Sequence, residues 1–315
     1  MSMENFFDII VVGAGSGGLN IASFMNRIGA KVLLIDKSDA HIGGDCLNFG
    51  CIPSKALIHA ARMVHDARGA TVFGLHVEGD VDWATVRAYI KEKQDVIRTH
   101  EDAAWFRARG ITVVLGEASF VSKNSVTVEG STYTAKKIVL ATGSRPRVLT
   151  GKGIEQVSRV LNNENIFTME SLPKKLLVLG GGPIGIEIAQ ALRYLCSEVT
   201  VTDPGAQILG KEDTDMAQVL FERLQQEGLT FLLGHTLKEF ISPTSAVFLS
   251  KEGQETTVTF DAVFVGIGRV LNTEGLQLQN AGIELDATGK LVVDPYLRTT
   301  NKNVLVCGDI AGNFQ

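Results

Sequence analysis

Two cysteines, Cys46 and Cys51, stand four residues apart in a glycine-rich segment, a spacing that suits metal binding, a disulfide or electron transfer. The chain has only four cysteines, too few for a secreted fold held together by disulfides. A structural bridge across so short a loop would also stabilise little. A metal site needs further ligands, and apart from the nearby His41 none has suitable spacing, so we expect no metal site. We favour a redox-active pair.

The residues after the cysteines indicate a helix. An apolar, alanine-rich run begins at Ala56, and Pro53 suits the first turn of a helix, where a missing N–H costs least. Both cysteines are therefore expected at the entrance of this helix. A helix amino terminus stabilises a thiolate, so we expect a lowered thiol pKa there.

A repeated motif brackets the cysteine pair in the sequence. In each copy an apolar strand, a glycine turn, a helix and a second strand ending in an aspartate follow one another, near residues 8–36 and 176–203. This is the dinucleotide-binding pattern, in which the glycines bring the helix amino terminus to a pyrophosphate and the carboxylate accepts hydrogen bonds from ribose. Two plain tight turns are the alternative, but the identical spacing disfavours it. Gly13, Gly15, Gly18 and Asp36 match Gly180, Gly182, Gly185 and Asp203 with a constant offset of 167 residues.

The remaining patterns predict the fold class. A closing strand is expected in each unit, at residues 137–141 and 262–265. Short alternating runs lie between, which we interpret as antiparallel meanders inserted in each unit. The sequence therefore predicts an α/β protein with two Rossmann-like nucleotide-binding domains, with a boundary near residues 148–172. The runs assigned to the meanders are residues 111–115, 125–128, 230–233, 246–249 and 257–260.

Composition narrows the function classes. The formal net charge of the 315 residues is −5, which does not favour a nucleic-acid or membrane partner. No apolar run approaches the roughly 20 residues that span a bilayer. The chain enters a strand near Phe6 without a basic leader, so we expect a cytoplasmic protein.

The segment from Gly43 to Lys55, GGDCLNFGCIPSK, resembles the redox signature of the class I pyridine nucleotide–disulfide oxidoreductases, such as dihydrolipoamide dehydrogenase and mercuric reductase. The resemblance implies an enzyme that uses FAD and NAD. It also implies that residues 1–150 plus 290–315 form the FAD-binding domain with the redox disulfide, and residues 151–289 the NAD-binding domain. The candidate cofactor-binding residues are Gly13, Gly15, Gly18, Asp36, Gly44, Gly143, Asp309, Gly180, Gly182, Gly185, Asp203 and Gly268.

The same resemblance assigns catalytic roles. Cys51 would be the charge-transfer thiol beside the flavin, and Cys46 the interchange thiol that meets the substrate. Lys55 would lie near the flavin N5 edge and pair with Glu187. Two solvated helix residues are the alternative interpretation of that last pair.

The acid Asp203 favours NADH over NADPH, because a carboxylate repels a 2′-phosphate and no arginine follows it in residues 204–209. The expected electron path runs between NAD(H), FAD and the cysteine pair, and then to or from a small disulfide, dithiol or soft-metal substrate. An NADH-dependent flavoprotein that reduces quinone or oxygen, with ancillary cysteines, is one alternative. A truncated nucleotide-binding fragment without turnover is another.

The chain ends soon after the second flavin motif, Gly308-Asp309, whereas the family continues into a dimerisation domain that supplies a His-Glu pair. We expect that domain to be absent here. A homodimer is expected for a full-length form, and the sequence leaves open whether this truncated form acts on the physiological substrate.

Overall fold

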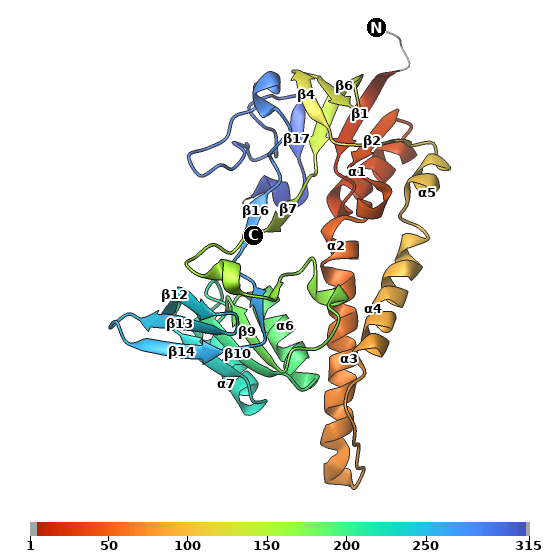
Figure 1. Ribbon diagram of the computed structural model, residues 1–315. Helices are drawn as coiled ribbons and strands as arrows, with labels where there is room; N and C mark the ends of the chain where they lie inside the picture. Colours follow the sequence, from red (N-terminus) through yellow and green to blue (C-terminus); the bar gives the residue numbers. More distant parts are fainter. Residues whose placement is uncertain (1–4, 313–315) are drawn as a thin grey trace. The chain divides into compact units, whose positions relative to one another are not determined.

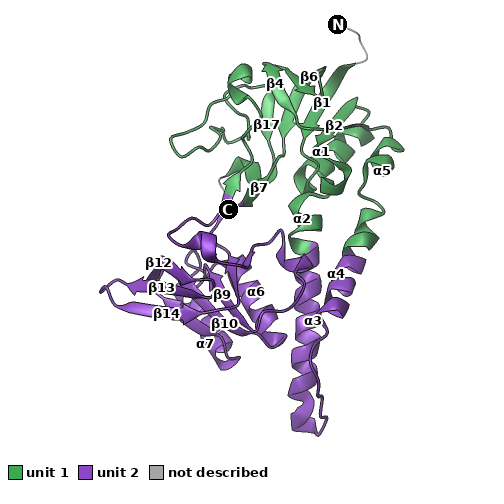
Figure 2. Ribbon diagram, viewed as in Figure 1, with its two compact units in different colours: residues 1–51, 94–145, 270–315 green, residues 52–93, 146–269 purple. Residues whose placement is uncertain are grey.

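The structure is a computed structural model that describes residues 5–312. The described chain forms two compact units (Figure 2). Unit 1 comprises residues 1–51, 94–145 and 270–315, and unit 2 comprises residues 52–93 and 146–269. Each unit is therefore assembled from separate segments of the sequence, three in unit 1 and two in unit 2.

Unit 1 is built on one seven-stranded sheet with the order β3-β2-β1-β6-β5-β4, and β17 pairs with β6 (Figure 1). The strands β3, β2, β1, β6 and β17 are parallel neighbours, whereas β4, β5 and β6 form an antiparallel meander. The strands are β1 (Phe6–Val12), β2 (Val32–Asp36), β3 (Thr112–Leu115), β4 (Ser119–Ser122), β5 (Ser125–Val128), β6 (Ser131–Leu140) and β17 (Val304–Val306).

The central strand β1 is buried on both faces, as its continuous apolar run requires. Ile10 and Val12 enter one buried cluster, while Ile9 and Val11 enter another that also holds Leu19 of α1. Alternate side chains of a strand point to opposite faces, so this one strand joins two layers of the core. The helical segments of unit 1 include α1 (Ser16–Arg27), η2 (Asp39–His41), α2 (Gly44–Asn48), α5 (Ala103–Arg107), η6 (Leu278–Ala281) and η7 (Gly308–Ala311).

Unit 2 repeats the plan with a five-stranded parallel sheet, in the order β11-β10-β9-β15-β8, and a separate antiparallel meander of β12, β13 and β14. Its strands are β8 (Val160–Leu161), β9 (Lys175–Leu179), β10 (Glu198–Asp203), β11 (Thr230–Leu233), β12 (His235–Ser242), β13 (Ser245–Ser250), β14 (Glu255–Thr259) and β15 (Ala262–Val265). Its helical segments are α6 (Pro183–Tyr194), α7 (Thr214–Gln226), η3 (Ala70–Phe73), η4 (Ile154–Gln156) and η5 (Ile166–Thr168).

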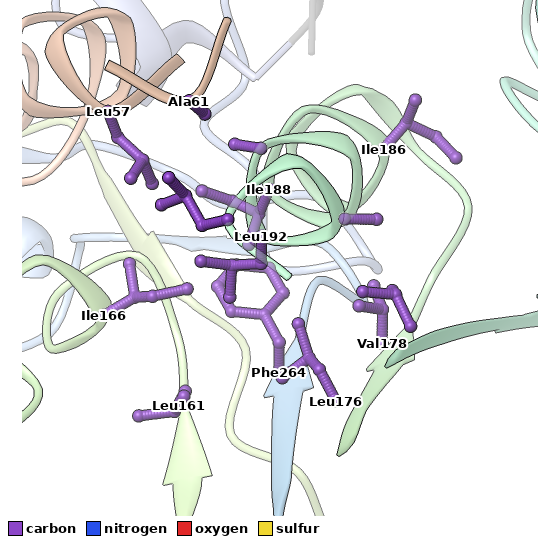
Figure 3. Close-up of a cluster of buried hydrophobic side chains, with 14 of the residues drawn as sticks. Leu57, Ala61, Leu161, Ile166, Leu176, Val178, Ile186, Ile188, Leu192 and Phe264 are labelled. Carbon is purple, nitrogen blue, oxygen red and sulfur yellow. The ribbon is translucent and has the colours of Figure 1, made fainter. Parts of the chain in front are cut away.

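Two long helices begin or end at the division between the units. The helix α3 (Cys51–Gly69) and the helix α4 (Trp83–Arg98) contribute most of their length to unit 2. Leu57 and Ala61 of α3 lie in one buried cluster with Leu192 of α6 and Phe264 of β15 (Figure 3). The short strands β7 (Ser144–Pro146) and β16 (Arg269–Leu271) pair with each other, and the division between the units falls within them.

The predicted α/β class with two Rossmann-like halves is confirmed, but two details of the meanders were wrong. Residues 111–115 and 230–233 were assigned to antiparallel insertions. The structure instead places β3 and β11 as parallel edge strands of the two main sheets, next to β2 and β10. Short edge strands are exposed on one face, so their sequences alternate like those of a meander. The antiparallel meanders are formed by β4–β6 and β12–β14.

The compact units divide the chain differently from the predicted domains. Residues 52–93 belong to unit 2, because the α3 and α4 side chains bury against its core, although they lie within the predicted segment 1–150. Residues 270–289 belong to unit 1, because Leu276 and Leu278 enter its core. Residues 313–315 of the predicted final segment lie outside the described residues.

Within residues 5–312, none of the helices is both long enough and apolar enough to cross a bilayer.

Candidate functional site

The first glycine turn joins β1 to α1 and leaves no room for side chains. Gly13 has φ +105°, and a Cβ added there would lie 2.3 Å from the Ala141 carbonyl oxygen. A Cβ on Gly18 would lie 1.9 Å from the Gly13 oxygen. The N-cap of α1 is Gly15, which supplies no side-chain cap. No N-cap side chain therefore binds the first amides of α1, and these amides are suited to an anion such as a pyrophosphate.

Asp36, at the end of β2, stabilises this turn. Its two carboxylate oxygens accept hydrogen bonds from the Ala14 N–H at 2.5 Å and the Lys37 N–H at 2.7 Å. Burial raises the pKa of Asp36, and the two backbone hydrogen bonds partly offset that rise. The aspartate thus fixes the turn, and its role in binding ribose is a proposal.

The second glycine turn has the same construction in unit 2. A Cβ on Gly180 would lie 2.4 Å from the Gly266 oxygen, and one on Gly185 would lie 2.1 Å from the Gly180 oxygen. Asp203 accepts hydrogen bonds from the Gly181 N–H and the Gly205 N–H, both at 2.7 Å.

The two turns differ in what covers them. The N-cap of α6 is Gly182, and a Cβ added there would meet no protein atom within 4 Å. In the first turn Gly15 faces Gly44, and a Cβ on Gly44 would lie 2.5 Å from the Gly15 Cα. Both turns have glycines that a Cβ would block and open helix amino termini, so both fit a dinucleotide.

Further candidate flavin residues lie together in unit 1. The Ser144 hydroxyl, next to Gly143, donates a hydrogen bond to the Asp309 carboxylate at 2.8 Å. Gly143 has φ +67°, and its carbonyl accepts a hydrogen bond from the Asn272 N–H at 3.0 Å. Sequence reasoning did not single out Ser144 or Asn272, because their partners are more than 120 residues away. In unit 2, Gly268 has φ +103° and its carbonyl accepts from the Arg147 N–H.

The cysteine pair lies beside the first turn. The Gly43 N–H donates to the Ala14 carbonyl at 2.9 Å, and this contact fixes the start of α2, which carries Cys46. Cys51 begins α3. The Cys51 side chain interacts with the Cys46 thiol and raises its pKa. The structure therefore brings together the two cysteines and the first glycine turn.

The expected lowering of the thiol pKa was wrong for Cys46. This residue lies in the separate short helix α2 rather than at the entrance of the long helix. Burial raises the pKa of Cys46, and the neighbouring Cys51 thiol raises it further, while a hydrogen bond with the Ser16 side chain lowers it. Sequence reasoning missed Ser16, although it occupies a variable position of the glycine motif.

Lys55 and Glu187 form an ion pair in unit 2. The Lys55 Nζ atom lies 2.6 Å from Glu187 Oε1, and the two side chains are 59% and 44% exposed. Exposed pairs of this kind contribute little to stability, about 1 kcal/mol at most. This contact excludes the alternative interpretation, in which Lys55 and Glu187 are two separately solvated residues. A role of the pair in catalysis is a proposal.

No group of three or more metal-binding side chains is present in the part of the chain that the structure describes. The absence of a metal site therefore stays a prediction.

Two Rossmann-like halves, two glycine turns stabilised by aspartates and a thiol pair beside one of them are the features expected of a nucleotide-dependent oxidoreductase. Residues 7–315 match the pyridine nucleotide-disulphide oxidoreductase family, and the chain belongs to that family. It is an enzyme family whose members use FAD and NAD(P)H.

The chain is similar to several dihydrolipoyl dehydrogenases. It is 36% identical over 320 residues to that of Chlamydia muridarum, covering 99% of this chain and 67% of the relative. It is 34% identical over 313 residues to that of Bacillus subtilis, covering 96% of this chain and 65% of the relative. The chain thus spans about two thirds of the length of these relatives.

Among solved structures, the chain is similar to the HOCl-induced flavoprotein disulfide reductase RclA of Escherichia coli in a Cu(II) complex. The TM-score is 0.84 at 28% sequence identity, covering 99% of this chain and 67% of RclA.

Proposed function

We propose that this chain passes electrons between NAD(H) and the Cys46–Cys51 pair through FAD, and exchanges them with a small disulfide or dithiol. The observation that carries the proposal is the contact of the two thiols beside the glycine turn, fixed by the Gly43 N–H to Ala14 hydrogen bond. A thiol pair at this place is within reach of a nucleotide bound by that turn.

FAD, when bound, would supply the two-electron relay between a nicotinamide and the disulfide. The chain's own residues would hold it: the turn at Gly13–Gly18 for the pyrophosphate, Asp36 for ribose, and Asp309 with Ser144 for the ribityl chain. The turn at Gly180–Gly185 would hold the nicotinamide nucleotide in unit 2. Lys55, oriented by Glu187, would place a positive charge at the flavin edge.

Thiol–disulfide exchange would carry the electrons from the cysteine pair to the substrate. Reduction of the Cys46–Cys51 disulfide takes up two electrons and two protons and gives two thiols. The Cys46 thiolate attacks a substrate disulfide, forms a mixed disulfide and releases one thiol of the substrate. Cys51 then attacks the Cys46 sulfur, which restores the intramolecular disulfide and releases the second thiol. Oxidation of a dithiol such as dihydrolipoamide follows the same steps in reverse.

A preference for NADH is part of the proposal. Two backbone amides fix Asp203, and this acid at the end of the second strand of the motif supports a position of its charge near a 2′-phosphate. Electrostatic repulsion would disfavour NADPH.

A metal ion is the second candidate substrate, since the similar RclA chain was solved as a Cu(II) complex. Two Cu(II) ions would each take one electron from the reduced Cys46–Cys51 pair, which gives two Cu(I) ions, the disulfide and two protons. The Cu(I) product is the soft copper ion that thiolates prefer. A homodimer of a full-length form and a cytoplasmic location stay predictions from the sequence.

Anaerobic titration of the FAD-loaded chain with NADH tests the proposal. A long-wavelength absorbance band, from a thiolate beside the oxidised flavin, is expected, and Cys51→Ser should abolish it. Simple bleaching of the flavin, with no such band, would favour the flavoprotein that reduces quinone or oxygen. Failure to retain FAD would favour a fragment without turnover. Adding lipoamide or Cu(II) to the reduced chain then identifies which of them restores the disulfide.

A further inference from the structure

The short helix α2, which carries Cys46, is held by a set of polar side chains from α4 and from the loop that follows it. The members of this α4 clamp are Gln94, Arg98 and Glu101, and all of them lie in unit 1 with α2. None of them belongs to the redox signature or to either glycine turn.

Gln94 binds the carboxyl end of α2. Its amide nitrogen donates to the Leu47 carbonyl at 2.9 Å and to the Asn48 carbonyl at 3.0 Å. The last carbonyls of a helix have no partner within the helix, so a side chain from outside can satisfy them. A helix of only five residues depends on such contacts, because its own hydrogen bonds are few.

Arg98 acts on α2 through Asn48. The guanidinium donates to the Asn48 side-chain oxygen and, at 3.4 Å, to the Ala40 carbonyl. A guanidinium only donates, so it fixes the amide oxygen of Asn48 toward α4 and turns the amide nitrogen away. That nitrogen donates to the Gly44 carbonyl at 2.9 Å and to the Ile42 carbonyl at 3.4 Å.

Asn48 is 9% exposed, so these hydrogen bonds exclude most water. Loss of the Arg98 partner would leave a buried amide oxygen unsatisfied, which is unfavourable. The amide could then rotate and release the Gly44 and Ile42 carbonyls. Those carbonyls belong to the first turn of α2 and to the loop before it, on either side of Gly43.

Arg98 also acts on the negative charge of Glu101. Glu101 Oε2 lies 3.0 Å from where a Cβ on Gly43 would stand, so its carboxylate borders the start of α2. Burial raises the pKa of Glu101, and the charge of Arg98 opposes that rise. One arginine therefore supports the helix at Asn48 and compensates the carboxylate at Gly43.

We infer that Arg98 is a positioning residue for Cys46, which holds α2 so that the Cys46 thiol stays against Cys51 and the disulfide is favoured over the open dithiol. The inference rests on the proposed redox role of this pair. A disulfide forms more readily when the two thiols are held at a high effective concentration. Loosening α2 should lower that concentration while the fold of unit 1 persists.

The test measures the dithiol–disulfide equilibrium of the FAD-loaded chain against reduced and oxidised dithiothreitol, with the melting temperature in parallel. For Arg98→Gln we expect the equilibrium constant for the Cys46–Cys51 disulfide to fall about tenfold, which raises its potential by about 30 mV. Arg98→Lys keeps the charge but loses the two-point contact, and should give a smaller fall in the same direction. If Arg98→Gln does not fold, the equilibrium constant of Arg98→Lys decides whether the inference holds.

Lys93→Gln is the matched control, because it removes one positive charge from the same helix at a side chain that pairs with Glu92. It should leave the equilibrium constant unchanged. The inference is overturned if the Arg98 variants lower only the melting temperature and shift the equilibrium less than about threefold, or if Lys93→Gln shifts it equally. A parent chain that forms no Cys46–Cys51 disulfide would overturn the proposed function as well, so the two failures are distinguishable.

Discussion

The two glycine turns have nearly the same internal geometry but opposite surroundings. In both, the first and third glycines touch backbone and an aspartate accepts two amides. The first turn is covered by the redox segment, since Gly44 lies against Gly15, whereas Gly182 has no protein atom near its Cβ position. On this basis we propose that the first site retains its nucleotide beside the thiols and that the second is open to a nucleotide that exchanges.

The largest effect should come from opening the covered turn. Gly44 has φ +60°, and the Cβ of Gly44→Ala would lie 2.5 Å from the Gly15 Cα. Overpacking of this kind costs roughly 3 kcal/mol, so FAD binding should weaken about 100-fold. Fluorescence titration of the apoprotein with FAD measures it.

Gly182→Ala is the matched substitution in the open turn. Its stability to urea and its FAD affinity should stay at the parent values, because the added methyl group meets no protein atom. NADH should bind about tenfold more weakly, since the methyl group enters the space expected for its pyrophosphate. Equal loss of FAD in both variants would refute the contrast between the turns.

The Lys55–Glu187 ion pair gives the next prediction. Glu187→Gln should slow flavin reduction by NADH about tenfold in stopped-flow measurements, because Lys55 loses the partner that orients its charge. The free energy of unfolding should change by less than about 1 kcal/mol, since both side chains are largely exposed. Removing another exposed pair of unit 2, with Lys175→Gln opposite Glu198, should leave the rate unaltered.

The two aspartates should differ in nucleotide choice. Asp203→Asn should reduce the preference for NADH over NADPH by roughly fivefold, because the repulsion of a 2′-phosphate is removed. Steady-state kcat/KM for each nucleotide provides the ratio. Asp36→Asn should leave the ratio as it is, and a shift there would contradict the assignment of the two turns.

The smallest effect concerns the pH dependence of stability. Burial raises the pKa of Asp36, so the folded state binds a proton more tightly than the unfolded chain. The stability linked to this proton is present at low pH and is lost as the pH rises through the folded-state pKa. The parent should therefore gain stability relative to Asp36→Asn as the pH falls from 7 to 4, in parallel urea unfolding series. A constant difference across that range would argue against a raised pKa.

Local sequence was sufficient to predict the strands, turns and helices that recur in the two units. The strand at 262–265 was predicted with the bounds that β15 has. A buried strand, a glycine turn and a helix each depend on residues close in the chain, so their patterns are readable. The edge strands β3 and β11 were misassigned because pairing direction depends on distant partners.

The sequence by itself determined the family, the two nucleotide turns and the cysteine pair, because each is specified by residue types at fixed short spacing. Only the tertiary structure decided that Cys46 is partly buried with a raised pKa, that α3 and α4 pack into unit 2, and that Arg98 and Asn48 support α2. Burial and contacts between distant segments arise from packing, and no local pattern encodes the distance between residues that are 50 positions apart.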